Sequence, residues 1–193
     1  MACPQMWLKL RLVIKILFVS TIIAFCATVV GFATPVWISE RFNVMVYNPG
    51  GDGTKEIANY LGIWQACGGD VSGCMNINKD LPAFLIATRA FACLGLIGAI
   101  ITTTLVLAGY SCLLNGETGR VLTVSMVLSF VTGVLLAISL AIFGGELGKY
   151  YLSFSFAMMC IASILYTVNG VLCLVCLCLG PDAPPYVPNN ADI

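Results

Sequence analysis

The sequence contains no histidine, and only 9% of its 193 residues are charged, with nine basic and nine acidic side chains that cancel. A soluble domain carries about a quarter charged residues, so these are too few to cover a water-facing surface. No basic run of the kind that binds nucleic acid is present. Histidine is the commonest general base and metal ligand. We therefore expect no catalytic residue, no metal site, no cofactor and no nucleic-acid partner.

Four apolar segments stand out instead, at residues 12–33, 81–114, 121–143 and 152–179. Each is long enough to cross a hydrocarbon core of about 30 Å as a helix. The alternative for the first segment is a cleaved signal peptide, but its apolar core exceeds the roughly 7–15 residues of such signals. We expect a single transmembrane domain over residues 1–193, an all-α four-helix bundle in the lipid bilayer.

The basic residues predict the orientation, since they gather on the cytoplasmic side of membrane proteins. Lys9, Arg11 and Lys15 precede or open the first segment, and Arg120 lies between the second and third. With four crossings, both termini are then cytoplasmic. We expect the protein to lie in the plasma membrane. The remaining regions are a large extracellular loop at 34–80, a short one at 144–151 and a cytoplasmic tail at 180–193.

The large loop has the pattern of a small antiparallel sheet. Strand candidates are Trp37–Tyr47, Tyr60–Cys67 and Cys74–Ile77, and a turn-rich stretch, Asn48–Gly53, separates the first two. Asp80 is a candidate cap for the second helix, with Pro82 in its first turn.

Cys67 and Cys74 flank a glycine-rich turn in this loop. Thiols oxidise outside the cell, and a hairpin brings facing Cβ atoms within disulfide range. The alternatives are two free thiols or a metal pair, although a zinc site would lack further histidine or cysteine ligands in the loop. We predict a disulfide.

These residues occur in a characteristic order: Trp37, then Gly62-Ile63-Trp64, then Cys67 and Cys74, then Arg89 near the start of the second helix. With the four helices and the large first loop, this order resembles the claudin superfamily. That superfamily includes claudins, peripheral myelin protein, the epithelial membrane proteins, the lens fibre membrane intrinsic protein and the calcium-channel gamma subunits. Ile63 replaces the usual leucine.

Trp37 and Trp64 suit the role of interfacial anchors, since tryptophan is enriched at that depth of the membrane. The resemblance implies that they pack beneath the sheet, and the two roles are compatible. It also points to acylation after helices two and four, where Cys112, Cys173, Cys176 and Cys178 are juxtamembrane candidates for palmitoylation. For the last three, a metal cluster and simple apolar packing are the alternatives.

Arg89 is a charge in an apolar segment, and burying it at the bilayer centre costs about 2.5–3.5 kcal/mol. We interpret it as a tether at the outer interface, bonded to loop carbonyls or to Glu146; snorkelling to water is the alternative. Asn169 is expected to form an interhelical hydrogen bond. The terminal Ile193 is a candidate end for a PDZ groove.

The sequence thus predicts a claudin-like, non-enzymatic plasma-membrane protein that acts at cell junctions or organises membrane assemblies. Its partners would be further copies or related four-helix membrane proteins. The alternative is an accessory subunit of an ion channel, similar to the calcium-channel gamma subunits.

Overall fold

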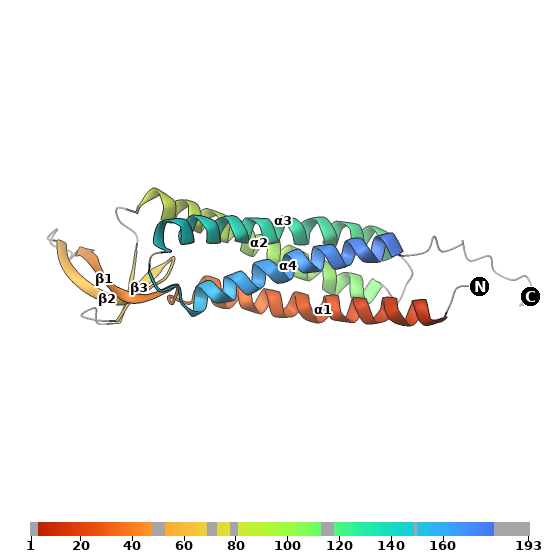
Figure 1. Cartoon of the computed structure of the whole chain (residues 1–193). Helices are drawn as coiled ribbons and strands as arrows, with labels where there is room; N and C mark the ends of the chain where they lie inside the picture. The colour runs from red at the N-terminus through yellow and green to blue at the C-terminus, as the bar shows by residue number, and fades with distance from the viewer. Residues whose placement is uncertain are drawn as a thin grey trace, which may run out of the picture.

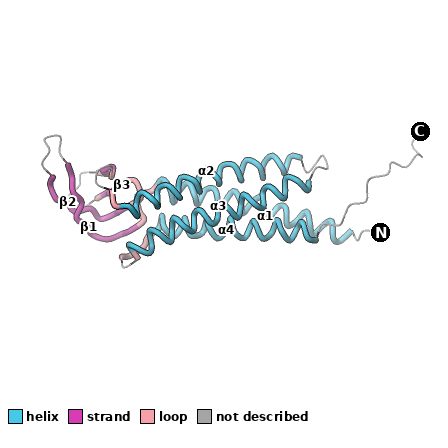
Figure 2. Tube along the Cα trace, turned by 90° about the horizontal axis from the view of Figure 1, so that it is seen from above, coloured by secondary structure: helices cyan, strands magenta, loops and turns pink. Residues whose placement is uncertain are grey.

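The computed structural model of the chain describes residues 4–47, 53–68, 73–77, 81–112, 118–148 and 150–179. Four long helices lie side by side in an elongated bundle that carries a sheet at one end (Figure 1, Figure 2). The first helix starts, and the fourth ends, at the opposite end. The helices are α1 (Pro4–Ala33), α2 (Ala83–Cys112), α3 (Thr118–Leu147) and α4 (Phe154–Leu179).

All four helices are long and apolar enough to cross a membrane. The shortest qualifying stretch, Lys15–Ala33, has 19 residues and is about 28 Å long at 1.5 Å per residue, close to the thickness of a hydrocarbon core. Isoleucine, valine and leucine side chains are exposed along the helices, as lipid contact requires. The chain is thus a multi-pass membrane protein, in agreement with its composition.

Two helix ends on the sheet side differ from the sequence prediction. Helix α3 continues to Leu147, so the first half of the predicted short outer loop at 144–151 is helical. The helix continues because Leu147 packs against the core, and Gly144 and Gly145 do not interrupt it. Helix α4 begins at Phe154 rather than at residue 152.

The start of α2 also differs from the prediction. The helix begins at Ala83, and the carbonyl of Pro82 accepts hydrogen bonds from Leu85 and Ile86. Pro82 therefore occupies the capping position, and not the first turn. Asp80, the predicted cap, lies outside the described residues.

The sheet has four antiparallel strands in sequence order, which confirms the predicted small antiparallel sheet. The strands are β1 (Ile38–Tyr47), β2 (Gly53–Leu61), β3 (Gln65–Cys67) and β4 (Cys74–Asn76). A bulge interrupts β1 between Ser39 and Phe42. Residues 48–52 of the predicted turn lie outside the described residues.

The apolar core is continuous from the middle of the bundle to the base of the sheet. It joins buried alanines of the helices, such as Ala24 and Ala99, to Trp37, Ile38 and Ile63 of the loop. Small residues bring the helices close together: a Cβ added at Gly133 would lie 3.1 Å from the Thr167 backbone nitrogen of α4. The sheet and the bundle therefore share one core.

Polar groups inside the bundle are paired across helices. The buried Asn169 of α4 accepts a hydrogen bond from the hydroxyl of Ser20 at 2.5 Å and donates one to Thr21 at 3.1 Å, both on α1. The predicted interhelical bond of Asn169 is confirmed. Ser139 of α3 donates to the carbonyl of Thr88 on α2 at 3.0 Å in the same manner.

Candidate functional site: the junction of sheet and bundle

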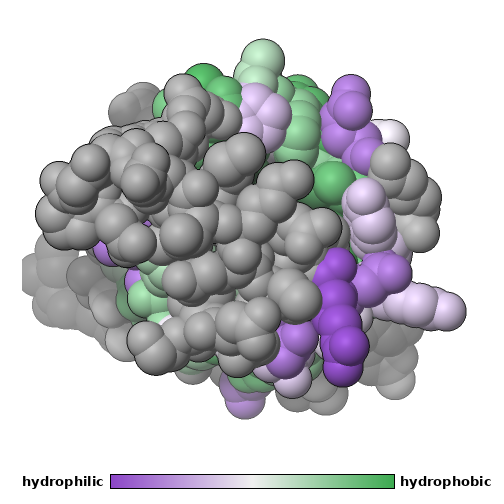
Figure 3. Space-filling view, turned by 90° about the vertical axis from the view of Figure 1, so that its left-hand side faces the viewer, coloured by the Kyte–Doolittle hydropathy of each residue, from purple (hydrophilic) through white to green (hydrophobic). Residues whose placement is uncertain are grey.

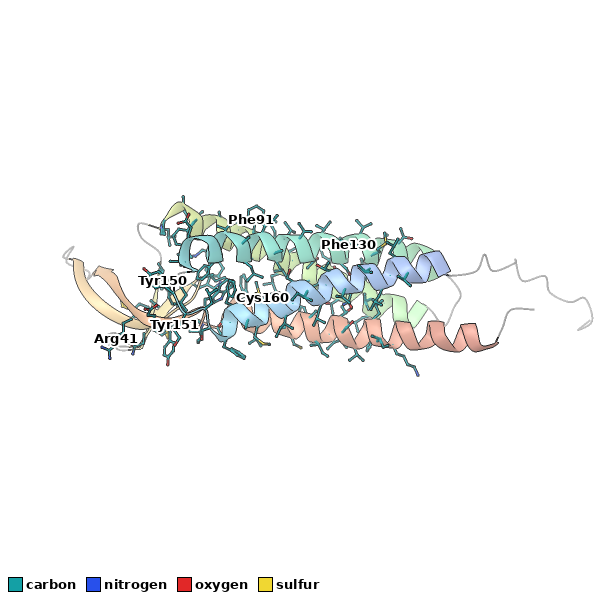
Figure 4. The ribbon with its side chains drawn as sticks, viewed as in Figure 1. Arg41, Phe91, Phe130, Tyr150, Tyr151 and Cys160 are labelled. Carbon is teal, nitrogen blue, oxygen red and sulfur yellow. A yellow bond between two sulfur atoms is a disulfide. The ribbon has the colours of Figure 1, made fainter. Side chains whose placement is uncertain are left out.

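The residues that carry the family resemblance come together where the sheet meets the helices. They come from three parts of the chain: the exit of α1, the β2–β3 turn with the adjoining hairpin, and the start of α2. Figure 4 draws the side chains of this junction on the ribbon. The residues are Trp37, Gly62, Ile63, Trp64, Cys67, Cys74 and Arg89.

Trp37 fills the space between the end of α1 and the α3–α4 hairpin. Its ring is fully buried and meets Phe143 edge-on at 4.8 Å between centroids and Phe156 at 5.8 Å. Its indole N–H donates to the carbonyl of Gly31 at 2.8 Å. That carbonyl belongs to the last turn of α1, whose carbonyls have no partner within the helix. Trp37 thus completes the helix end and fixes where the loop begins.

Arg89 joins α2 to two separate loop segments. Its Nε donates to the carbonyl of Ile63 at 2.6 Å, and its Nη2 donates to the carbonyl of Ile77 at 2.7 Å. The guanidinium also lies 5.0 Å from the centre of the Trp64 ring, within cation–π range. These contacts support the interpretation that Arg89 tethers α2 to the loop by hydrogen bonds to loop carbonyls. Glu146, the acidic partner considered from the sequence, is exposed and is not among the described contacts of Arg89.

Trp64 links this arginine to the first helix. Its ring packs against Phe32 at 5.3 Å between centroids, and both rings pack against the buried core. The indole nitrogen is buried and has no hydrogen-bond partner among the described residues. The Trp64 ring is therefore held by its contacts with Phe32 and Arg89, whereas the Trp37 ring also donates a hydrogen bond.

The predicted strand Tyr60–Cys67 is in fact two strands with a turn between them. β2 ends at Leu61, and β3 begins at Gln65, after the Gly62-Ile63-Trp64 turn. The amide of Gly62 donates to Gln65 at 2.8 Å, and a Cβ at this position would lie 2.5 Å from Pro35 Cα. Only glycine allows the chain at residue 62 to lie this close to Pro35. In the resulting turn, the Ile63 carbonyl faces Arg89.

The predicted disulfide between Cys67 and Cys74 is confirmed. The two residues are directly opposite each other on β3 and β4. Gly68 and Gly73 next to them have φ of 78° and 104°, a region that favours glycine, and the Gly68 amide donates to the Gly73 carbonyl. The disulfide holds β4 beside β3, so that Ile77 just beyond β4 reaches Arg89.

A further attachment was not predicted from the sequence: the α3–α4 connection adds to the free edge of β1. The amide of Ser39 donates to Tyr151 at 3.2 Å, and the amide of Ser153 donates to Trp37 at 2.8 Å. An isolated antiparallel bridge pairs Ile38 with Leu152. The segment is too short to show strand periodicity in the sequence. Its pairing with β1 therefore became visible only in the structure, where Tyr151 and Leu152 are exposed.

Hydroxyl groups strengthen this second attachment at the helix ends. The hydroxyls of Thr34 and Ser155 lie 2.6 Å apart, and Ser155 Oγ also accepts a hydrogen bond from the Val36 amide at 3.1 Å. The exit of α1 and the start of α4 are therefore bonded directly to each other. The sheet is thus fastened at both edges, by α2 at one and by the α1 and α4 ends at the other.

The side chains of the junction attach the sheet to the helices. In the part of the chain that the structure describes, no three His, Cys, Asp or Glu side chains are grouped to hold a metal ion. The ionic group of the junction, Arg89, is already engaged by two carbonyls and a ring.

The cysteines proposed for acylation have different surroundings. Cys173 is buried in the bundle with 1% of its surface exposed, as in the apolar-packing alternative. The side chains of Cys112, Cys176 and Cys178 lie outside the described residues, as does Ile193 with the rest of the tail.

No protein-family model matches the chain, and no curated protein matches it. The resemblance to the claudin superfamily therefore depends on the order of the junction residues along the chain and on the four-helix architecture with its small sheet.

Proposed function

We propose that the chain is a claudin-like protein of the plasma membrane, non-enzymatic, which acts at cell–cell contacts or organises membrane assemblies. The observation that carries this proposal is the double fastening of the sheet, by Arg89 at one edge and by the segment around Ser153 at the other. A surface held in one orientation loses little conformational freedom on binding, which favours association.

The basic residues support an extracellular position for the sheet. Lys15 of α1 and Arg120 of α3 lie toward the helix ends that are remote from the sheet. Positive charge accumulates on the cytoplasmic side, so both termini would be cytoplasmic. The Cys67–Cys74 disulfide agrees with this orientation, because disulfides persist outside the cell and are rare in the cytosol.

A mixed culture of cells that express two differently tagged copies tests the proposal. We expect enrichment where two expressing cells meet and no enrichment where one borders a non-expressing cell. Arg89→Gln should reduce the enrichment while surface expression persists, and Glu146→Gln, at an exposed position outside the described contacts of Arg89, serves as its control. Uniform distribution together with co-purification of a channel would overturn the contact role and favour the accessory-subunit alternative.

A further inference from the structure

A row of exposed polar and aromatic side chains crosses the base of the sheet on its outward face. Ser39 is paired with Tyr60 on β2, and the bridge at Ile38 places Tyr151 opposite Ser39 on the other side. Residues opposite each other in antiparallel strands share a face. Tyr151 is 78% exposed and Tyr60 is 41% exposed, whereas Ile38, one position along, is fully buried. We call Tyr151, Ser39 and Tyr60 the tyrosine row.

Charge and apolar surface adjoin this row. Arg41 is exposed and lies on the same side of the sheet as Tyr151 (Figure 4). In the end-on view, strongly hydrophilic residues gather at the lower right, and hydrophobic residues are visible mainly along the upper rim (Figure 3). Leu152, which is paired with Ile38 on the other face, is 39% exposed, and Phe154 at the start of α4 is 55% exposed, so exposed apolar side chains follow Tyr151 along the chain into α4.

The distance between Tyr151 and the apolar span of α4 indicates what covers the tyrosine row. Phe154 is the first residue of the apolar span of α4. An extended chain advances about 3.3–3.6 Å per residue, so Tyr151 lies at most about 11 Å beyond the span. The headgroup layer of a bilayer is about 5–8 Å thick on each side, and a tyrosine side chain is long enough to reach into it.

We propose that the tyrosine row and Arg41 rest on phospholipid headgroups of the leaflet on the sheet side. Tyrosine is enriched at this depth because its ring is apolar and its hydroxyl is polar. An arginine guanidinium binds phosphate through paired charge-assisted hydrogen bonds. Since Tyr151 is bonded to β1, contact with lipid at the row sets the tilt of the sheet against the membrane. This inference does not depend on the cell-contact function.

Fluorescence quenching in vesicles of phosphatidylcholine tests the proposal. The emission of the new tryptophan in Tyr151→Trp is obtained by subtracting the spectrum of the parent protein. A nitroxide on the lipid headgroup should quench this emission at least about twofold more than aqueous iodide does. Tyr60→Trp is a second variant that should behave in the same way. The matched control is Tyr47→Trp at the far end of β1, roughly 25 Å along the strand, where iodide should dominate.

Two results would overturn the proposal. If iodide quenches Tyr151→Trp and Tyr47→Trp equally and the headgroup nitroxide quenches neither, the row faces water. If the tryptophan is shielded from both quenchers, and dilution of the protein in lipid restores iodide quenching, a second copy of the chain covers the row. Retention of the Cys67–Cys74 disulfide, measured by thiol labelling, shows that each variant has a folded sheet.

Discussion

Removal of the Arg89 side chain should open one edge of the sheet and leave the other edge closed. Arg89→Gln eliminates two hydrogen bonds from a charged donor, at 2.6 and 2.7 Å, and one cation–π contact. Hydrogen bonds of this type contribute about 1.5–3 kcal/mol each. Because the glutamine can retain part of one bond, we expect the free energy of local opening to fall by about 3 kcal/mol.

Hydrogen–deuterium exchange of the protein in nanodiscs measures this change. A loss of about 3 kcal/mol corresponds to amide exchange roughly a hundredfold faster. The affected amides should include Gly62, which donates to Gln65, and Ile77, which donates to Trp64. The amide of Ser153, bonded to Trp37 at the other edge, should keep its parental rate.

Two further variants make the Arg89 prediction specific. Arg89→Lys keeps the charge but lacks the fork that reaches two carbonyls, so its exchange rates should lie between those of the parent and Arg89→Gln. Arg41→Gln removes an exposed arginine of the same sheet and should leave the exchange of the Gly62 amide within about threefold of the parent. Parental exchange at Gly62 and Ile77 in Arg89→Gln would refute the tether.

Three other substitutions probe the bundle and the hairpin. Gly31→Ala should lower stability by about 1–3 kcal/mol in detergent unfolding, because the new Cβ would lie 2.5 Å from Met159 Cγ and 2.9 Å from a backbone oxygen; Gly145→Ala, with nothing within 4 Å of the new Cβ, should not lower stability. Asn169→Leu removes two interhelical bonds and should cost about 1–2 kcal/mol in the same assay; an unchanged midpoint would contradict its structural role. Cys74→Ser should destabilise the sheet by about 2–3 kcal/mol, seen as faster protease cleavage of the outer loop with helix content unchanged.

The features that the sequence predicted are those with local signals. Long apolar runs specify membrane helices because the backbone must satisfy its own hydrogen bonds in lipid. The disulfide was predictable because Cys67 and Cys74 flank a turn only a few residues long. Arg89 was interpretable as a tether because a charge in an apolar helix must find partners.

The features that the sequence did not reveal depend on contacts between distant segments. The break in the predicted strand at Gly62 follows from the close approach of Pro35, which no local pattern encodes. The pairing of Leu152 with Ile38 joins residues more than a hundred positions apart. The continuation of α3 to Leu147 depends on the core that this residue meets, since Gly144 and Gly145 alone favour a loop.

The two attachments make the orientation of the sheet a consequence of helix packing. Arg89 moves with α2, whereas Ser153 and Ser155 move with the start of α4. A change in the position of α2 relative to α4 cannot be absorbed at one attachment, because the Ile63 and Ile77 carbonyls and the Trp37 carbonyl belong to one hydrogen-bonded sheet. Either the sheet must twist or one attachment must break. Substitutions deep in the bundle can therefore alter the surface that the sheet presents, although none of the substituted residues lies in it.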